Sequence, residues 1–338
     1  MSFFLTTEAT EITEKKIKFK SPCISLLWFI VILCSHVSLF AGFSVLKAHA
    51  ATLIDADGRS VNFSRPFCRI ISLYPAHTEN LFSLGLDEEI IGVSRNGVYP
   101  EAARKKDSFH YREDAEKFIA ARPDLVLVRP MISRSYPQLI GQLKKAGIAV
   151  ISLQPTSVES MFAYWRNLGE LTGRQDAAEK MIHDFEKGRA AISAKVSAIP
   201  FDQRKNVYFE AIHHKMKTFA PSSLAIFALE TAGGRNAASD AVQVRTSNIG
   251  YYGKERILAK GSEIDIFLAQ KGVMNKISIE AIRLEPGFMA IKAVREGKIY
   301  LIDEAIVSRP TLRLLEGIRL IFGILYPSCE LKRMLPGT

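Results

Sequence analysis

The sequence predicts an α/β fold made of two α/β lobes with parallel-type sheets, joined by one long rigid helix. In the first half of the chain, short apolar strand patterns alternate with helical patterns, which is typical of a parallel sheet. An apolar period of 3.6 residues then continues over about 22 residues, or about 33 Å of helix. Further strand patterns follow Pro200 and supply the second lobe.

The expected organisation has six parts. They are a signal peptide or N-terminal anchor over residues 1–50, a lead-in over 51–67, an N-terminal lobe over 68–173, a spacer helix over 174–200, a C-terminal lobe over 201–330 and a tail over 331–338.

Composition narrows the classes of partner. The 338 residues are 48% hydrophobic and 24% charged, which fits a globular chain long enough for two domains. The net charge of +10 fits nucleic acid, an anionic small ligand or an anionic membrane surface. No Lys/Arg block exceeds three residues, and no basic stripe is interleaved with aromatic residues. We therefore expect no nucleic-acid partner.

The first 50 residues have the pattern of an export signal. A basic cluster over 15–20 precedes an apolar run from Cys23 to Leu46, and Ala48-His49-Ala50 offers a cleavage site. This order predicts a secretory signal peptide and a periplasmic protein. The apolar run is also long enough to span a bilayer, so an uncleaved anchor is the alternative. Cys34 follows Val-Ile-Leu, which lacks the small residue expected beside a lipoprotein cysteine. We therefore expect no lipoprotein site at Cys34.

Two cysteines, Cys68 and Cys329, lie beyond this leader, and the sequence contains no CxxC. A structural zinc site or a thioredoxin-like motif is therefore not expected. A disulfide between the two cysteines stays open, because the sequence alone does not establish their proximity.

The N-terminal lobe is expected to alternate strands and helices. The strand patterns cover 68–73, 90–93, 125–128 and 148–153, and the helical patterns cover 78–84, 115–121 and 136–146. Asp55-Ala-Asp57-Gly58 is typical of a turn in the polar lead-in. The stretch Arg69–Gly85 reads as strand, tight polar turn and helix, which puts Tyr74 and His77 at the C-terminal edge of the sheet, where ligands bind. An ordinary βα unit has the same pattern.

The middle of the chain predicts two helices. Thr156-x-x-Glu159 has the spacing of a capping box that opens a helix ending near Leu171. Asp176-x-x-Glu179 opens the long helix, and Pro200 ends it. Its apolar positions keep the helical period: Ala178, Met181, Ile182, Phe185, Ile192 and Val196. Such a helix is either a stiff spacer between two lobes or an ordinary long surface helix.

The C-terminal lobe is expected to contain strands over 207–211, 264–269 and 299–302. Ser222 is predicted to cap a helix that runs through Leu229, and residues 312–325 predict a final amphipathic helix.

Each lobe carries one acidic residue in a matching context. Glu116 and Glu255 each lie on a short predicted helix that is followed by a turn and a buried strand. One carboxylate per lobe favours a two-point docking surface for a basic partner. Surface glutamates are common, so an ordinary solvated role remains the alternative.

Five segments in order resemble the substrate-binding proteins of ABC importers for iron–siderophore, haem and cobalamin. They are RIISLYPAHTENLFSLG, Glu116 with the following Ala-Arg-Pro-Asp-Leu-Val, Glu255 with the following Ile-Leu-Ala, the stretch Ala293–Asp303, and Arg309-Pro310. The resemblance covers about Arg69 to Pro327. It implies two α/β lobes joined by a long helix, with the ligand between them and no catalysis.

The resemblance also implies roles for individual residues. Glu116 and Glu255 would pair with arginines of the membrane permease. The matching loops supply the ligand-binding candidates Tyr74, Pro75, His77, His110, Tyr111, Arg129, His213, His214, Met216, Phe219, Tyr251, Tyr252 and Arg309. Aromatic side chains with a few Arg and His suit a bulky, often anionic iron or cobalt chelate. The chain lacks the second-lobe arginine cluster expected for a carboxylate-rich siderophore.

Several points stay open. The histidines His77, His110, His213 and His214 either ligate iron or cobalt directly or hydrogen-bond to a chelate. No cofactor is expected to be required, and we expect a monomer whose partners are an ABC permease and a metal chelate of unspecified identity.

Two other classes of protein are the alternatives. A chelate-processing enzyme is disfavoured because the sequence has no GxSxG, HExxH, P-loop or GxGxxG after a strand. A protein that binds a bare transition-metal ion needs three or four converging ligands, and no His-rich acidic loop is present.

Overall fold

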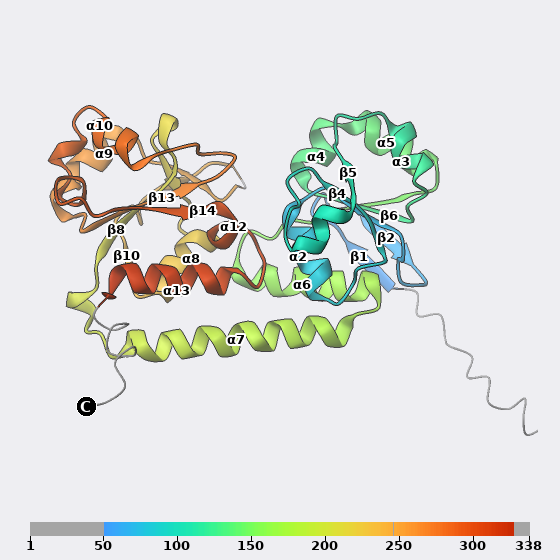
Figure 1. Ribbon diagram of the computed structural model, residues 1–338, viewed down its shortest axis with the longest axis horizontal. Helices are drawn as coiled ribbons and strands as arrows, with labels where there is room; N and C mark the ends of the chain where they lie inside the picture. Colours follow the sequence, from blue (N-terminus) through green and yellow to red (C-terminus); the bar gives the residue numbers. More distant parts are fainter. Residues whose placement is uncertain (1–50, 246, 328–338) are drawn as a thin grey trace, which may run out of the picture. The chain divides into compact units, whose positions relative to one another are not determined.

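The computed structural model describes residues 51–245 and 247–327, which belong to one compact unit (Figure 1). The leader, the tail and Cys329 lie outside these residues. The cleavage site and the expected lack of a lipoprotein site therefore stay predictions, and the Cys68–Cys329 disulfide stays open. Cys68 is exposed. Within the described ranges, no helix is both long and apolar enough to cross a membrane. The lobe boundaries also stay predictions, and N-lobe and C-lobe below denote residues 68–173 and 201–327.

The N-lobe is built on a five-stranded parallel sheet in the order β5-β4-β3-β6-β7. The strands are β3 (Ile70–Ser72), β4 (Ile90–Ser94), β5 (Asp107–Phe109), β6 (Leu125–Val128) and β7 (Ala149–Ser152), and the helices are α2 (Pro75–Ser83), α3 (Ala115–Ala120), α4 (Pro130–Ser135) and α5 (Pro137–Lys145), with the 3-10 turn η1 (Glu101–Lys105). Strand β6 is buried at every position, as expected for a parallel strand covered on both faces. The sequence patterns missed β5 and α4 because both are too short to show a period.

The lead-in forms a β-hairpin that the sequence analysis did not predict. Strand β1 (Ala51–Ile54) pairs antiparallel with β2 (Ser60–Phe63). The predicted turn lies between the strands, where Gly58 has a φ of 78°, a conformation that glycine adopts without steric cost.

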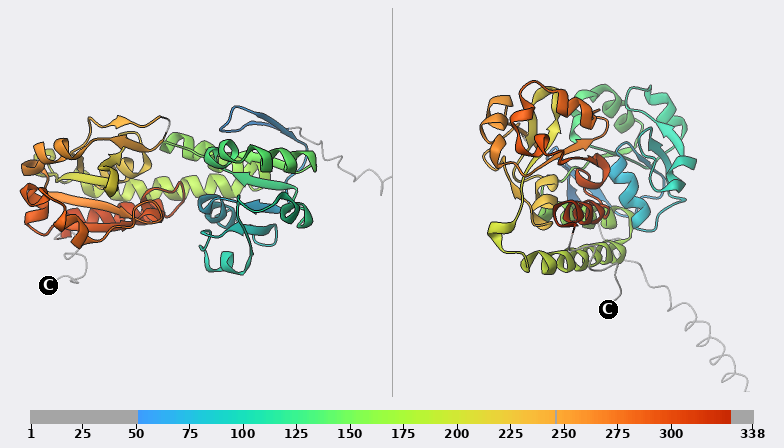
Figure 2. Two further views of the ribbon diagram at one scale, coloured as in Figure 1. Left: turned by 90° about the horizontal axis from the view of Figure 1, so that it is seen from above. Right: turned by 60° about the vertical axis from the view of Figure 1, so that its left-hand side comes forward.

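The long helix is confirmed. Helix α7 (Gln175–Ser197) has 23 residues, and all six predicted apolar positions are buried. It packs against α6 (Val158–Thr172) of the N-lobe and against two C-lobe helices, α8 (Leu224–Thr231) and α13 (Leu314–Leu325). Figure 1 and Figure 2 show α7 running along both lobes. Phe185 lies where the two lobes meet, with its ring 5.7 Å from Trp165 and 6.5 Å from Phe227.

Three predicted helix caps were wrong. Helix α6 is capped by Ser157, whose hydroxyl accepts from the Ser160 N–H at 3.2 Å, one residue later than the expected Thr156 and Glu159 pair. Helix α7 starts after Arg174, and no side chain caps it. Ser223 replaces Ser222 as the cap of α8. In α6 and α8 a neighbouring serine offers the same hydroxyl, so composition does not decide between them.

The C-lobe sheet is mixed, not parallel throughout. Its order is β11-β12-β9-β8-β13-β14, and β10 also pairs with β8. The elements are β8 (Asn206–Ile212), β9 (Lys217–Phe219), β10 (Arg235–Asn236), β11 (Val242–Gln243), β12 (Ile249–Tyr251), β13 (Ile266–Lys271), β14 (Ile299–Asp303), α9 (Lys254–Ala259), α10 (Ile279–Leu284), α11 (Lys292–Arg295), α12 (Glu304–Val307) and the turns η2 (Phe201–Gln203), η3 (His213–Lys215), η4 (Gly261–Glu263) and η5 (Phe288–Ala290). The short connection η3 makes β9 antiparallel to β8, because parallel strands need a long crossover.

The two lobes share a structural detail that supports their common pattern. Asp124 precedes β6 and accepts from the backbone N–H groups of Cys68 and Arg69, both at 2.9 Å. Asp265 precedes β13 and accepts from the Asn206 N–H at 2.9 Å. Each carboxylate therefore ties the start of one central strand to the start of its parallel neighbour.

A set of polar contacts connects the lobes, and we call it the interlobe clamp (Glu79, Asn80, Trp165, Arg309, Pro310). The Pro310 carbonyl oxygen accepts from Asn80 Nδ2 at 2.9 Å and from Trp165 Nε1 at 3.0 Å. Arg309 Nη1 donates to Glu79 Oε1 at 2.8 Å. The C-lobe segment before α13 is thereby held on N-lobe helices α2 and α6.

Candidate ligand site between the lobes

A cavity of about 230 Å³ opens between the two lobes. It lies at the carboxyl ends of parallel strands from both sheets, which is the usual place for ligands in α/β proteins. The N-lobe lines it with Leu73, Tyr74, Pro75, Ser94, Arg95, Asn96, His110, Tyr111, Arg129, Met131, Ile132 and Gln154, and the C-lobe with Asn248, Ile249, Gln270, Val273, Met274, Glu304, Ser308 and Arg309.

Six of the predicted site residues line this cavity: Tyr74, Pro75, His110, Tyr111, Arg129 and Arg309. Five of them come from the N-lobe, where they follow the ends of β3, β5 and β6. Since parallel strands end at one edge of a sheet, residues just beyond those ends converge.

The rings of Tyr74, His110 and Tyr111 form part of the N-lobe wall. The ring of Tyr111 lies 4.1 Å from that of His110 and 4.8 Å from that of Tyr136. The Arg129 guanidinium lies 5.1 Å from the centre of the Tyr74 ring. Burial raises the pKa of Tyr74, so this phenol stays neutral at physiological pH. Partial burial, followed by the charges of Arg95 and Arg112, lowers the pKa of His110, so a neutral imidazole faces the cavity.

The three arginines of the cavity differ in their partners. Arg95 pairs with Glu113 at 3.2 Å, and Arg309 pairs with Glu79 at 2.8 Å. Arg129 makes no ion pair with any described residue, and its guanidinium rests on the Tyr74 ring. Its charge is therefore available to an anionic group of a ligand.

The C-lobe wall is polar and has an apolar rim. The Ser308 hydroxyl donates to Gln270 Oε1 at 2.8 Å, and Gln270 Nε2 donates to the Ala211 carbonyl at 2.9 Å. Beside them, Val273 and Met274 are 64% and 49% exposed. Asn275 fixes their loop, because its side chain accepts from the His213 N–H and donates to the Gln270 carbonyl.

His77 does not face the cavity, which corrects its predicted placement. The side chain is fully buried. Nε2 donates to the Val128 carbonyl at 3.0 Å, and Nδ1 therefore accepts from the Tyr164 hydroxyl at 2.7 Å. Burial lowers the pKa of His77 to about 4. With both nitrogens engaged, His77 is a neutral core histidine that holds α2 against β6 and α6.

Most C-lobe candidates also lie elsewhere. Phe219 is fully buried beside Phe209, and Tyr252 is 7% exposed and donates to the Ala237 carbonyl. Neither reaches the cavity. The remaining candidates are outside the cavity lining as well: Met216 and His213 are partly buried, and His214 and Tyr251 are exposed. Antiparallel pairing directs β9 and β12 differently from the parallel strands, so their neighbours do not converge on the same edge.

His213 lies in a charged cluster of its own. Nδ1 is 2.8 Å from Glu210 Oε2, and Nε2 is 3.5 Å from Glu285 Oε2. Lys254 completes the cluster at 2.6 Å from Glu285. The hydrogen bond to Glu210 is the main cause that raises the pKa of His213. No group of three or more His, Cys, Asp or Glu side chains suited to a metal ion occurs in the part of the chain that the structure describes.

Glu116 and Glu255 lie in matching positions. Each occupies the first turn of a short helix, α3 or α9, and each side chain is exposed. Neither forms an ion pair or hydrogen bond with the described residues. The two carboxylates are therefore accessible to a partner.

Sequence reasoning missed the cavity residues Gln270, Glu304 and Asn248. Gln270 is the penultimate residue of β13, and Glu304 directly follows β14. Both lie at or just beyond the ends of the predicted strands over 264–269 and 299–302. The convergence of residues at the ends of parallel strands would therefore have indicated them. Asn248 precedes an antiparallel strand, and no sequence signal indicated it.

The comparisons with known proteins agree with this architecture. The family model described as periplasmic binding protein matches residues 70–306. The chain belongs to the periplasmic binding protein family. The predicted family and the prediction of a solute-binding protein, not an enzyme, are thereby confirmed.

Two relatives and one solved structure illustrate the range of similarity. An uncharacterised ABC transporter substrate-binding lipoprotein of Bacillus subtilis is 26% identical over 82% of this chain and 85% of its own length. A vitamin B12-binding protein of Vibrio cholerae is 22% identical over 75% and 87%. The structure of a possible iron-binding (periplasmic solute-binding) protein from Staphylococcus epidermidis superimposes with a TM-score of 0.67 at 27% identity, covering 78% of this chain and 100% of that one.

Proposed function

We propose that this periplasmic binding protein is the solute-binding component of an ABC importer and that it carries an iron or cobalt chelate between its lobes. The single observation behind this proposal is the cavity at the strand ends of both sheets, with three rings on its N-lobe wall and an arginine that has no ion pair among the described residues. The names of the relatives, which include a vitamin B12-binding protein and an ABC transporter lipoprotein, support the class of cargo and of transporter.

The chelate is expected to carry an anionic group. Arg129 would receive that group, because the other two cavity arginines already pair with Glu113 and Glu79. The rings of Tyr74 and Tyr111 would pack on its apolar part. The absence of a metal-ligating cluster in the described residues favours a ligand whose metal is already chelated.

Delivery to the permease is assigned to Glu116 and Glu255. Both are exposed and lack partners among the described residues, so both can pair with basic residues of a permease without first breaking an ion pair. Export to the periplasm and a monomeric state belong to the same proposal.

The test begins with native mass spectrometry of protein purified from its own source, which identifies any retained chelate. Binding of haemin, cyanocobalamin and a ferric hydroxamate is then measured for the wild type, Arg129→Ala and Arg95→Ala. Arg129→Ala should weaken binding of an anionic chelate about tenfold or more. Arg95→Ala is the matched control and should change affinity about threefold at most, because its charge is already paired. A chain that retains no chelate and binds none of the three would overturn the proposal.

A further inference from the structure

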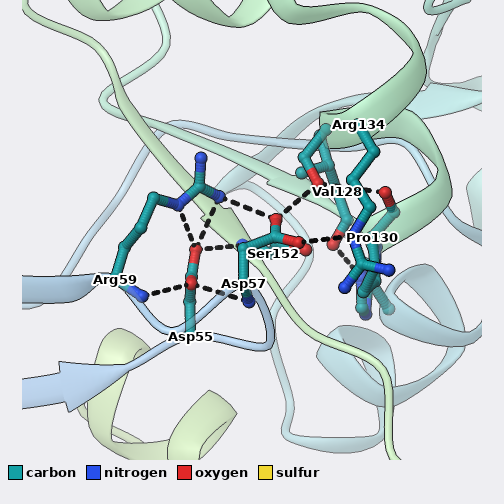
Figure 3. Close-up of polar contacts among 9 residues, drawn as sticks. Asp55, Asp57, Arg59, Val128, Pro130, Arg134 and Ser152 are labelled. Atoms are coloured by element: carbon teal, nitrogen blue, oxygen red, sulfur yellow. Dashed lines mark hydrogen bonds and ion pairs between the residues drawn. The ribbon is translucent and has the colours of Figure 1, made fainter. Parts of the chain in front are cut away.

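The turn of the N-terminal hairpin is internally fixed by one buried carboxylate. Asp55 is 4% exposed. Its Oδ1 accepts from the Asp57 N–H at 2.9 Å and the Arg59 N–H at 3.0 Å, and its Oδ2 accepts from Arg59 Nε at 2.9 Å. Figure 3 shows Asp55, Asp57 and Arg59 gathered in this turn. The turn is therefore a rigid platform.

The platform is attached to the sheet edge at which the cavity opens. The Ala56 N–H donates to the Ser152 carbonyl at 2.7 Å, and the Ser152 N–H donates to Asp55 Oδ2 at 3.3 Å. Ser152 is the last residue of β7, and Gln154 of the cavity follows it by two residues. The hairpin thus lies at the carboxyl end of the sheet.

From this platform Asp57 reaches a neighbouring helix. Its Oδ2 accepts from the Ser133 hydroxyl, and its Oδ1 accepts from Arg134 Nε at 3.2 Å. Its side chain is 13% exposed, and Arg59 approaches it at 3.1 Å. Both hydrogen-bond donors lie on α4, as Figure 3 shows for Arg134.

Helix α4 depends on such contacts. It has six residues, and its N-cap residue Arg129 makes no side-chain cap. Helices this short are marginal without tertiary contacts. The carboxylate of Asp57 lies beside the last turn, where the helix dipole disfavours a negative charge. The helix dipole therefore does not explain why Asp57 lies there. The hydrogen bonds that the Asp57 carboxylate accepts from Ser133 and Arg134 do explain it.

The same helix carries part of the cavity wall. Arg129 stands immediately before it, and Met131 and Ile132 lie in its first turn. We infer that Asp57 is a positioning residue, which holds α4 on the hairpin and thereby sets the place of Arg129 and Met131 in the cavity. The effect on ligand affinity rests on the function proposed above, whereas the positioning of α4 does not.

Hydrogen exchange tests the positioning without any ligand. Asp57→Asn should raise exchange about tenfold at the Ile132, Ser133 and Tyr136 amides, whose bonds to Arg129 and Ile132 carbonyls close α4. Exchange in α5 and β7 should not change. The control is Thr52→Val, which removes an exposed hairpin hydrogen bond to Asn62 and should leave α4 unchanged.

A reciprocal variant keeps the test independent of the hairpin's own folding. Ser133→Ala with Arg134→Gln should raise exchange in α4 as Asp57→Asn does, and combining all three changes should add nothing. Unchanged exchange in α4, additive effects, or an equal rise across hairpin, β7 and α4 would overturn the inference.

Affinity supplies the functional readout. With haemin, cyanocobalamin or the ferric hydroxamate as the probe, whichever the wild type binds, Asp57→Asn should weaken binding about three- to tenfold while Thr52→Val leaves it unchanged. Loosened α4 with unchanged affinity would overturn the cavity role of Asp57. If the wild type binds none of the three probes, the affinity inference falls with the proposed function, and the exchange result still decides the positioning.

Discussion

The two lobes repeat one plan and use it for different tasks. In both, an aspartate ties two central parallel strands together, and a short helix carries an exposed glutamate. The N-lobe contributes rings and Arg129, which has no ion pair in the described part of the chain, whereas the C-lobe contributes Gln270, Ser308 and the paired Arg309 to the cavity. The N-lobe wall is thus suited to attract a ligand. The polar side chains named for the C-lobe wall already bond to other groups of the protein.

The lobes also differ in the surroundings of one histidine each, His77 and His213. His77 of the N-lobe is neutral and bonded to a carbonyl and a phenol. His213 of the C-lobe lies between two carboxylates, which favour its charged form. The N-lobe therefore surrounds its histidine with neutral groups, whereas the C-lobe surrounds its histidine with carboxylates. The shared backbone plan does not determine this difference.

The largest expected effect is on chelate uptake. It tests whether the two lobes contribute equally to docking on the permease. Glu116→Ala with Glu255→Ala should abolish chelate uptake by cells and leave chelate affinity unchanged, because both side chains are exposed and outside the cavity. Each single variant should retain partial uptake, since the docking glutamate of the other lobe remains. Uptake of the retained chelate is measured in cells that carry each variant as the sole copy.

Glu101→Ala with Glu296→Ala is the control, because both glutamates are exposed and pair only with neighbouring lysine or arginine. Normal uptake by the double docking variant would remove both assignments. A single variant as severe as the double would show that one lobe alone provides the docking.

The next effect concerns the interlobe clamp. Glu79 is 2% exposed, and burial is the main cause that raises its pKa, opposed by Arg309 and Arg313. Glu79→Ala leaves the largely buried Arg309 without its 2.8 Å partner, so the free energy of unfolding should fall by about 3 kcal/mol. Urea unfolding measures this loss. Glu296→Ala, which breaks the exposed pair with Lys298, should cost under about 1 kcal/mol.

An equal loss in the two variants would mean that the Glu79–Arg309 pair is no stronger than a surface ion pair. The lobes would then be held together by α7, by its apolar contacts and by the hydrogen bonds of Asn80 and Trp165 to the Pro310 carbonyl oxygen.

The difference between the lobes also explains what the sequence could predict. In the N-lobe, an all-parallel sheet makes the strand ends converge, and the predicted ligand-binding residues Tyr74, Tyr111 and Arg129 line the cavity. In the C-lobe, the antiparallel strands β9 and β12 follow from short connections that carry no periodic signal. Phe219 and Tyr252 were therefore misplaced, and their aromatic character reflects the core.

His77 shows a further limit. Its position after β3 was predicted, but whether a side chain beside a strand end points into the cavity or into the core depends on tertiary partners. Tyr164, the partner of Nδ1, lies 87 residues away in the sequence. The buried face of the long helix, by contrast, was predicted because six apolar residues at a regular period determine it.

The last prediction tests the two histidines through the pH dependence of stability. The pKa of His77 lies at about 4 in the folded chain and near 6.5 in the unfolded chain. Below pH 6.5 the unfolded state binds the extra proton, so stability should fall by up to about 3 kcal/mol as the pH drops to 4. His213 has a raised pKa, so its contribution is present below pH 6.5 and is lost as the pH rises through the folded value. Urea midpoints between pH 4.5 and 8.5 measure both slopes.

Two variants separate these slopes. His77→Gln should be less stable at pH 7, because it loses hydrogen bonds to Val128 and Tyr164, yet its stability should depend less on pH on the acid side. His213→Gln should lose more stability at pH 6 than at pH 8, because the charged imidazole no longer balances Glu210 and Glu285. The exposed His214→Gln serves as the control. An unaltered acid slope in His77→Gln would mean that the N-lobe histidine is not held neutral, and the contrast between the lobes would then reduce to their cavity walls.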